Sequence, residues 1–177
     1  KPDVIVHAGD HYDLPSMSAW DRKKTSAKFE GRRYRADVQA GHDGLERLEA
    51  ALDAHNKKVT GYKNAPYRPE KHVTWGNHEN RIKTAISHDP RLEWDRFGIS
   101  FKHLNTKKWF DEYHEYENGA PKIHRYDGVD YAHFVTAGNM GRPLAGIHHA
   151  YGLVQTRYNS CIVGHTHKRD VYFKDGV

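Results

Sequence analysis

The sequence has a single cysteine, no long apolar run and no internal repeat. Cys161 is the only cysteine among 177 residues, which excludes an internal disulfide framework. Nothing approaches the roughly 18 consecutive apolar residues of a transmembrane helix, so we expect no membrane partner. No tract is low in complexity, and the chain alternates short apolar runs with amphipathic segments.

The composition is that of one globular domain with an excess of positive charge. A chain of 177 residues can bury roughly 70% of its unfolded surface in one core. Hydrophobic residues make up 37% and charged residues 29%, within the globular range. The formal charge of +5 favours an anionic partner such as phosphate or nucleic acid, without determining the fold.

The lone cysteine bears on the cellular compartment, and the two chain ends bear on whether the sequence is truncated. A lone cysteine is compatible with a reducing compartment, so we expect a cytoplasmic protein. The first residue is Lys1 and not methionine, and Asp175-Gly176 resembles a hairpin turn that lacks its second strand. We therefore expect a chain truncated at both ends.

Hydrophobic periodicity predicts alternating strands and helices. Leu45, Leu48, Ala51 and Leu52 recur at helical spacing and predict a helix over 36–57. Short helices are expected at 79–86 and at 89–97, the second with Asp89 as N-cap. Alternating aromatic residues predict antiparallel strands over 100–136, and a helical pattern follows at 146–158. Further strands are expected at these segments: 4–8, 71–75, 160–163 and 170–173. The expected fold class is a mixed α/β sheet with helices packed on it.

Three times an apolar strand runs into glycine and then into side chains that bind metals. The stretches are "VIVHAGDHYD" (4–13), "HVTWGNHE" (72–79) and "CIVGHTH" (161–167). In open α/β sheets, loops beyond the carboxyl ends of the strands converge at one edge. The side chains expected to meet there are those of Asp10, Asn77, His78, His165 and His167.

Carboxylate and amide oxygens together with imidazole nitrogens suit a divalent first-row ion. Mn is the preferred choice, with Fe, Zn or Ni as alternatives, and a thiolate site is disfavoured. An aspartate can bridge two ions through its two oxygens, and two such ions about 3.5 to 4 Å apart can bind a phosphate oxygen and activate water. The sequence thus favours hydrolysis of a phosphate ester. The competing interpretation is that glycine turns simply favour Asp and Asn, with satisfied surface histidines nearby.

The ordered set "GDHYD", "GNHE" and "GHTH", each after a strand, resembles the motifs of calcineurin-like metallophosphoesterases. The resemblance implies a four-layer α/β sandwich, with mixed sheets inside and helices outside, and a dinuclear centre with metal-activated water. It implies that Asp10 bridges both metals, that Asn77 and His165 bind the second metal, and that His167 binds the first. The histidine after the asparagine, here His78, is implied to contact substrate or to protonate the leaving group.

The family has a further metal-binding histidine between the second and third motifs, at a strand end. His133 in "DYAHFVTAG" fits best, because an alternating run precedes it and a glycine-containing loop follows. His148 and His149 are the alternatives, although both lie in helical-looking sequence.

One family motif, an N-terminal D-x-H strand, has no counterpart before Asp10. Without it, the first metal would have only Asp10 and His167, too few protein ligands for a catalytic site. We expect residues 1–177 to be a single metallophosphoesterase domain that lacks its first strand. A natural variant with one metal or none, and substitution by His7 or His11, remain alternatives.

Several neighbours of the motifs are candidates for supporting roles. Asp13 and Glu79 are expected to orient histidines or loops, and are not expected to bind metal directly. Arg81 could contact a substrate phosphate or be an exposed helix arginine. The basic stretch 22–35, interleaved with aromatic residues, could bind a nucleic-acid backbone or be an ordinary solvated surface.

The sequence therefore predicts a metal-dependent hydrolase of phosphate esters, with a preference for phosphodiesterase or nuclease activity because of the basic stretch. The partners expected are a phosphate-ester substrate and nucleic acid. The alternatives are a phosphomonoesterase and a non-catalytic binding module with a degenerate metal site.

Overall fold

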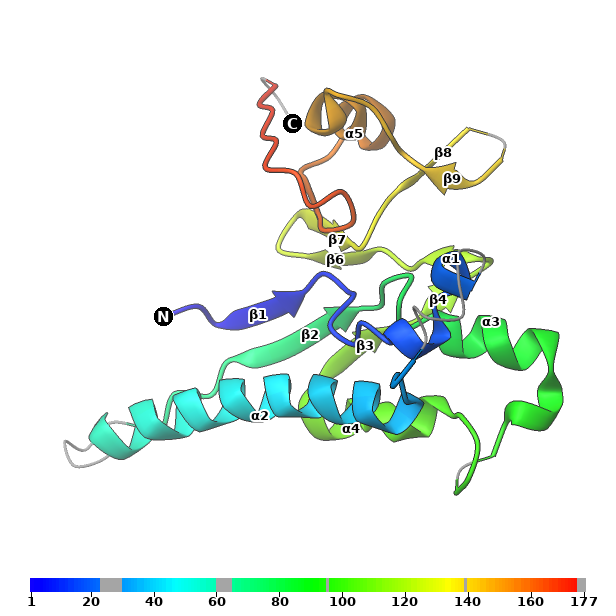
Figure 1. The fold of residues 1–177 in the computed structure, drawn as a ribbon. Coiled ribbons are helices and arrows are strands. Elements are labelled where there is room, and N and C mark those ends of the chain that lie inside the picture. The colour runs from blue at the N-terminus through cyan, green and yellow to red at the C-terminus, as the bar shows by residue number, and fades with distance from the viewer. Residues whose placement is uncertain (23–29, 60–64, 95, 139, 175–177) are drawn as a thin grey trace.

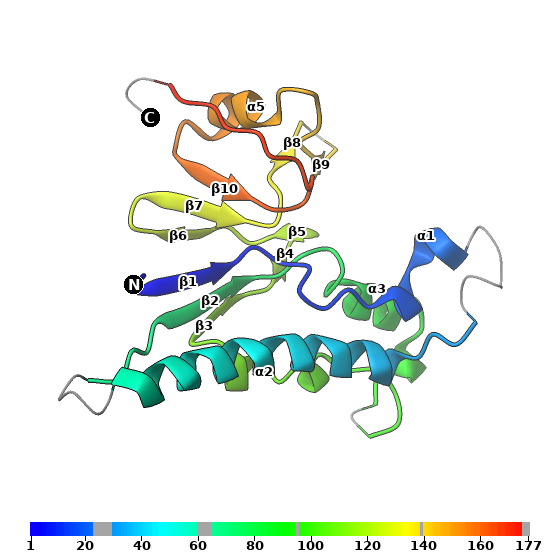
Figure 2. The same cartoon turned by 60° about the vertical axis from the view of Figure 1, so that its left-hand side comes forward.

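The computed structural model describes residues 1–22, 30–59, 65–94, 96–138 and 140–174, with the side chains of Trp20 and Arg22 left undescribed. Two three-stranded sheets lie between α2 (Tyr34–Val59) on one side and α5 (His149–Arg157) on the other, in both views (Figures 1 and 2). The predicted mixed α/β class is confirmed.

The first sheet is parallel and has the order β1-β2-β3. Its strands are β1 (Val4–His7), β2 (Glu70–Thr74) and β3 (Glu112–His114). The second sheet has the order β10-β7-β6, with β7 parallel to β10 and antiparallel to β6. Its strands are β6 (His124–Tyr126), β7 (Val129–Ala132) and β10 (Cys161–Val163).

Short hairpins and helices connect the strands, and the β4–β5 hairpin leads from the first sheet to the second. The hairpins are β4 (Tyr116–Glu117) with β5 (Ala120–Pro121), and β8 (Thr136–Ala137) with β9 (Arg142–Pro143). The short helices are α1 (Ala19–Arg22), α3 (Arg81–His88) and α4 (Thr106–Trp109), and the 3-10 turns are η1 (Pro15–Met17), η4 (Pro90–Leu92) and η5 (Phe101–Leu104).

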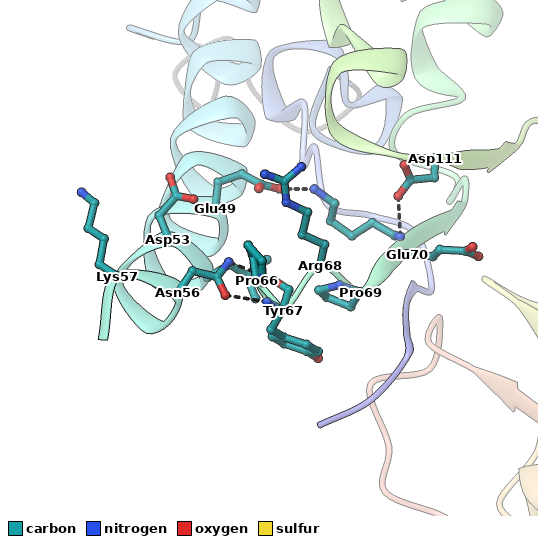
Figure 3. A pocket seen from close by; sticks show the side chains of 12 residues that line it. Glu49, Asp53, Asn56, Lys57, Pro66, Tyr67, Arg68, Pro69, Glu70 and Asp111 are labelled. Atoms are coloured by element: carbon teal, nitrogen blue, oxygen red, sulfur yellow. Dashed lines mark hydrogen bonds and ion pairs between the residues drawn. The ribbon is translucent and has the colours of Figure 1, made fainter. Parts of the chain in front are cut away.

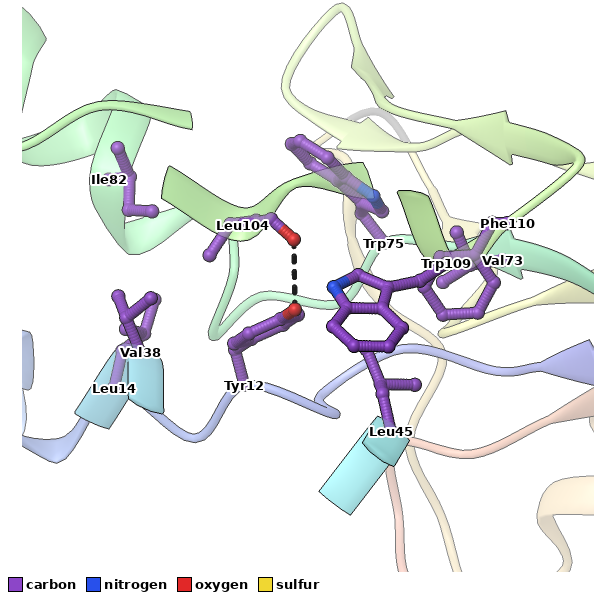
Figure 4. Packing of buried hydrophobic residues seen from close by; sticks show 10 residues of the cluster. All are labelled: Tyr12, Leu14, Val38, Leu45, Val73, Trp75, Ile82, Leu104, Trp109 and Phe110. Carbon is purple, nitrogen blue, oxygen red and sulfur yellow. Dashed lines mark hydrogen bonds between the residues drawn. The ribbon is translucent and has the colours of Figure 1, made fainter. Parts of the chain in front are cut away.

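The main apolar core packs the parallel sheet against α2 and the helical turns before β3. Figure 4 shows its ten residues: Tyr12, Leu14, Val38, Leu45, Val73, Trp75, Ile82, Leu104, Trp109 and Phe110. Tyr12 donates a hydrogen bond from its hydroxyl to the carbonyl of Leu104 at 2.9 Å, which satisfies the one polar atom that this ring brings into the core. This core fixes the turn after β1, because Tyr12 and Leu14 belong to that turn.

Most predicted elements are present, with four corrections. The predicted helix at 89–97 is only the turn η4, although the Asp89 side chain does accept from the backbone N–H of Arg91 as an N-cap. Residues 101–109 are helical, and β3 joins β2 in parallel, so only part of 100–136 is antiparallel. Residues 170–173 form no strand, because no described strand pairs with them. In α2, Leu45 is buried but Ala51 is exposed.

Candidate metal centre

The turn that follows β1 touches the turn that follows β2. Gly9 has φ of +84°, and a Cβ atom placed on it would lie 2.5 Å from the backbone nitrogen of Gly76. Asp10 has φ of 55°, in the left-handed region that few non-glycine residues adopt. Glycine before each polar residue therefore lets the two strand ends approach until their backbones are in contact.

Four ligand atoms, one from the end of each of the strands β1, β2, β7 and β10, converge beyond these turns. Around Nε2 of His133 lie Asn77 Oδ1 at 2.9 Å, His165 Nδ1 at 3.0 Å and Asp10 Oδ2 at 3.1 Å. Ligand atoms of Asp10, His133 and His165 all lie within 4.8 Å of one another. We call Asp10, Asn77, His133 and His165 the edge centre, because they meet at the carboxyl edge of the strands.

The hydrogen-bonding pattern of the edge centre suits a cation. Nδ1 of His133 lies 2.8 Å from the carbonyl oxygen of Ala8, which can only accept, so Nδ1 carries a proton. In neutral His133, Nε2 then has no proton, and its lone pair faces the oxygens of Asp10 and Asn77. Such a group of acceptors needs a positive charge among them, supplied by a proton on His133 or by a metal ion. The donor set is of the kind that first-row divalent ions prefer.

The pKa values of the edge centre reflect this crowding. Burial raises the pKa of Asp10, but hydrogen bonds from His133 and from the backbone N–H of His78 outweigh burial and hold the pKa below its usual value. Burial lowers the pKa of His133, but Asp10 outweighs it, so the pKa is raised. Burial and the positive charge of His133 lower the pKa of His165. Asp10 and His133 therefore each favour the charged form of the other.

Glu79 holds the two turns together from beneath the edge centre. Its side chain is 2% exposed. Oε2 accepts from the backbone N–H groups of Asp10 at 3.0 Å and Gly76 at 2.9 Å, and Oε1 accepts from Tyr12 at 2.9 Å. A buried carboxylate with three N–H donors is well satisfied. Glu79 thus lies where an acid that orients loops was expected.

His78 lies over Asp10 and is oriented by Asp13. The backbone N–H of His78 donates to Asp10 Oδ1 at 2.9 Å, and its side-chain Nε2 lies 3.6 Å from Asp10 Oδ2. Nδ1 of the same ring lies 2.8 Å from Oδ1 of Asp13, an exposed side chain. The ring is thereby fixed with Nε2 directed at the edge centre.

Arg81 faces the loop after β1, next to a pocket of about 790 Å³ that reaches Asn77. Its Nη1 donates to the carbonyl oxygens of Asp13 at 2.7 Å and Leu14 at 3.2 Å. Burial lowers the pKa of Arg81, partly offset by Asp13 and Asp10. The rest of the pocket is lined by η1, α1, α3 and η4, including Met17, Ala85 and Leu92.

The structure does not bring every candidate to the edge centre. His167 is exposed and is not part of the metal-type group found among the described residues. His148 is exposed, and His149 is buried with Nε2 2.9 Å from the carbonyl of Leu144, so neither of these alternatives to His133 lies there.

The two histidines considered as substitutes for D-x-H face the apolar core instead. His7 packs edge-on against Phe110, with ring centroids 5.1 Å apart. Nε2 of His11 lies 2.8 Å from the carbonyl oxygen of Gly41 in α2. Neither histidine is part of the metal-type groups found among the described residues, so substitution by His7 or His11 stays a hypothesis without support from these contacts.

Tyr116 is a neighbour of the edge centre that the sequence did not single out. Its hydroxyl is buried and has no hydrogen-bond partner within the described residues. Burial raises the pKa of this hydroxyl, and the negative charges of Asp10 and Glu79 raise it further. Tyr116 belongs to an alternating aromatic run, a pattern that gives no sign of its proximity to a carboxylate 106 positions away.

Another pocket, of about 610 Å³, lies between α2 and the start of β2 (Figure 3). Lys71 there pairs with Glu49, and its backbone N–H donates to Asp111 at 2.9 Å. None of the predicted site residues lines this pocket, so it is not the candidate site.

Most of the basic stretch cannot be compared with its prediction, since residues 23–29 lie outside the described residues. Two of its described arginines have partners in the protein: Arg32 pairs with Asp21 at 2.7 Å, and Arg35 donates to the carbonyl of Arg96.

Among the described residues, none of the helices combines the length and the apolar character that a membrane crossing requires. Comparisons with protein-family models, with curated proteins and with solved structures find no match to this chain.

Proposed function

We propose that this chain is a metal-dependent phosphoesterase domain of the calcineurin-like type, with the four-layer sandwich of that family. One observation carries the proposal: Asp10, Asn77, His133 and His165 converge on one point, with His78 directed at Asp10. These are the residues that the three motifs and the intervening strand end singled out. The α2, sheet, sheet, α5 order of Figures 1 and 2 is compatible with four layers.

In this proposal the edge centre holds a divalent ion, with Mn as the preferred metal. Such an ion polarises a phosphate ester and lowers the pKa of water. The other oxygen of Asp10, Oδ1, accepts from the backbone N–H of His78 and has a second lone pair for another ion, as the family pattern implies. Asn77 and His165 bind from opposite turns, and the carbonyl of Ala8 keeps the Nε2 lone pair of His133 directed at the ion.

His78 has the role of general acid. Asp13 holds its Nδ1, so that Nε2 faces the position where the leaving oxygen of a bound phosphate ester lies and transfers a proton to it. Arg81 holds the loop that carries Asp13 and borders the adjoining pocket, where the leaving group has room. A nucleic-acid or other phosphodiester substrate is preferred, because the chain carries a formal charge of +5.

A second candidate is a binding module with a degenerate, mononuclear centre. One observation favours it: His167, one of only two ligands expected for the first metal, is exposed and lies outside the group formed by the edge centre. Metal stoichiometry separates this candidate from the first, since a dinuclear enzyme binds two ions per chain.

The decisive experiment compares hydrolysis of a phosphodiester chromogen, a phosphomonoester chromogen and single-stranded DNA in the presence of Mn²⁺. We expect phosphodiester hydrolysis that collapses in Asp10→Asn and falls about 100-fold or more in His78→Ala. His148→Ala, at an exposed position, is the matched control and retains full activity. Full activity in both site variants would contradict the proposal, and indifference to DNA at low salt would remove the nuclease preference.

A further inference from the structure

A second group of imidazole and carboxylate side chains lies away from the edge centre, between the two sheets. It consists of His72 on β2, Glu112 and His114 on β3, and His124 on β6, and we call it the intersheet cluster. Ligand atoms of His72, Glu112 and His124 lie within 4.8 Å of one another. His72 precedes Asn77 by five positions, or roughly 16 Å along an extended chain, so the two groups are distinct.

Strand register brings these residues together. In the parallel β2–β3 pair, His72 lies opposite Glu112, and Thr74 lies opposite His114. Side chains two apart on a strand share a face, so Glu112 and His114 point the same way. His124 comes from the other sheet, through the hairpin of β6 and β7. The intersheet cluster therefore joins side chains from both sheets.

The contacts within the cluster are close. His72 Nδ1 lies 2.9 Å from His124 Nε2, and the ring of His114 stacks on that of His124 with centroids 4.3 Å apart. Glu112 reaches all three rings: its Oε1 is 2.9 Å from His114 Nε2 and 3.6 Å from His124 Nδ1, and its Oε2 is 3.8 Å from His72 Nε2.

One ring nitrogen of the cluster is poorly satisfied for a protein interior, although both nitrogens of His72 have partners, His124 Nε2 at 2.9 Å and Glu70 Oε2 at 3.2 Å. His72 and His124 are 2% and 4% exposed. Nε2 of His114 is buried and forms no well-aligned hydrogen bond with a described residue, although the Glu112 carboxylate is near. Buried polar atoms without partners are costly, so a group that receives several lone pairs at once would relieve the cluster.

We propose that the intersheet cluster binds one divalent transition-metal ion, with zinc as the best match, through His72, Glu112 and His124. Ligands of tetrahedral zinc at 2.0 to 2.1 Å from the metal lie about 3.3 Å from one another. The separations between the proposed ligands are of this order, since one atom from each lies within 4.8 Å of the others. His114 contacts Glu112 and positions its carboxylate.

The role of this ion is to cross-link the sheets. His72 and Glu112 belong to the β1-β2-β3 sheet and His124 to the β10-β7-β6 sheet, so one ion bonded to all three connects both. The side chain of Glu112 is 48% exposed, which gives an ion a path from solvent. Binding that occurs only in the folded state stabilises that state.

The test uses the full chain carrying Asp10→Asn and His165→Gln, so that the edge centre cannot account for bound metal. The chain is dialysed against ZnCl₂, and bound zinc is measured by elemental analysis. We expect about one zinc per chain and a rise in melting temperature on zinc addition. Adding Glu112→Gln or His124→Gln abolishes both effects, whereas the exposed control His148→Gln retains them.

Absence of bound zinc in the edge-centre double variant would overturn the proposal. Zinc that is retained in both added variants would overturn it too. Should His124→Gln fail to fold by circular dichroism, Glu112→Gln decides, because its half-exposed side chain tolerates an isosteric change. This test measures bound zinc and melting temperature and not hydrolysis. A failure of the intersheet site can therefore be told apart from a failure of the proposed function.

Discussion

Gly76 and Asp10 are packed so closely that no side chain fits between them. A Cβ atom on Gly76 would lie 2.0 Å from Asp10 Oδ1 and 2.5 Å from the Asp10 backbone nitrogen. The backbone cannot move aside easily, because Glu79 binds the N–H groups of both residues. The glycine of the second motif is thus required by the aspartate of the first.

Gly76→Ala is expected to lower the free energy of unfolding by about 1 to 3 kcal/mol, because it overpacks this contact. It should also weaken metal binding by displacing Asp10. Denaturant unfolding and metal titration measure the two effects. Gly152→Ala in α5 is the control: its added methyl meets only the Leu144 side chain, at 3.2 Å, and helix propensity favours alanine. Equal stability of Gly76→Ala and the parent chain would contradict the steric interpretation.

Glu79→Gln tests the carboxylate beneath the edge centre. The amide nitrogen of glutamine cannot accept a hydrogen bond, so at least one of the three backbone donors loses its partner. We expect a loss of about 1 to 3 kcal/mol in the free energy of unfolding, measured in urea. Glu46→Gln on the exposed face of α2 removes the same charge and should change stability by less than about 0.5 kcal/mol. Similar losses in the two variants would exclude a specific role for Glu79.

Asp13→Asn separates orientation of His78 from metal binding. Within the described residues the Asp13 carboxylate contacts His78 and no ligand of the edge centre, so the metal should bind as before. Loss of an orienting carboxylate typically reduces activity about 10- to 100-fold. The expected change is in kcat, with altered pH dependence. The exposed Asp43→Asn variant is the control, and weaker metal binding in Asp13→Asn would show that Asp13 acts on the metal and not on His78.

His7 should make the protein less stable in acid. Burial, followed by the positive charges of His11 and Lys71, lowers its pKa from 6.5 to about 4. Between these pH values the unfolded chain binds more protons at His7 than the folded chain does, so the free energy of unfolding falls as the pH drops from about 6.5 towards 4.

His7→Gln removes this titration and should flatten the decline over that interval, measured as the difference between the variant and the parent chain in urea unfolding at several pH values. His148→Gln, which is exposed, should leave the parent profile unchanged. Parallel profiles for His7→Gln and the parent would show that His7 does not titrate differently on folding.

The parts that the sequence predicts well are those with local signals. A β-branched run ending in glycine marks β1, β2 and β10, and an alternating run marks β7 ahead of His133. The pairing of β3 with β2 has no such local signal. It joins residues about 40 positions apart and depends on how the chain packs. The helical turns at 101–109 are too short to show periodicity, although Ser100 caps the first through a hydrogen bond to the N–H of Lys102.

The same division applies to the candidate site. Asp10, Asn77 and His165 follow strand ends, and the convergence of parallel strands brings such residues together. Glu79 was singled out as a neighbour of a motif, but Tyr116 was missed, because it is defined only by what it contacts in space. The intersheet cluster was also missed, because its histidines lie within strands and become neighbours only when two sheets stack.

The hydrogen bond from His133 Nδ1 to the carbonyl of Ala8 spans 125 residues and crosses from one sheet to the other. The edge centre consequently exists only when both sheets have docked, and its contacts have high sequence separation. In the proposed metal-bound form, metal affinity is then a measure of completed assembly, and the ion shifts the folding equilibrium as a ligand of the native state alone. We expect removal of such an ion to destabilise the contact between the two sheets.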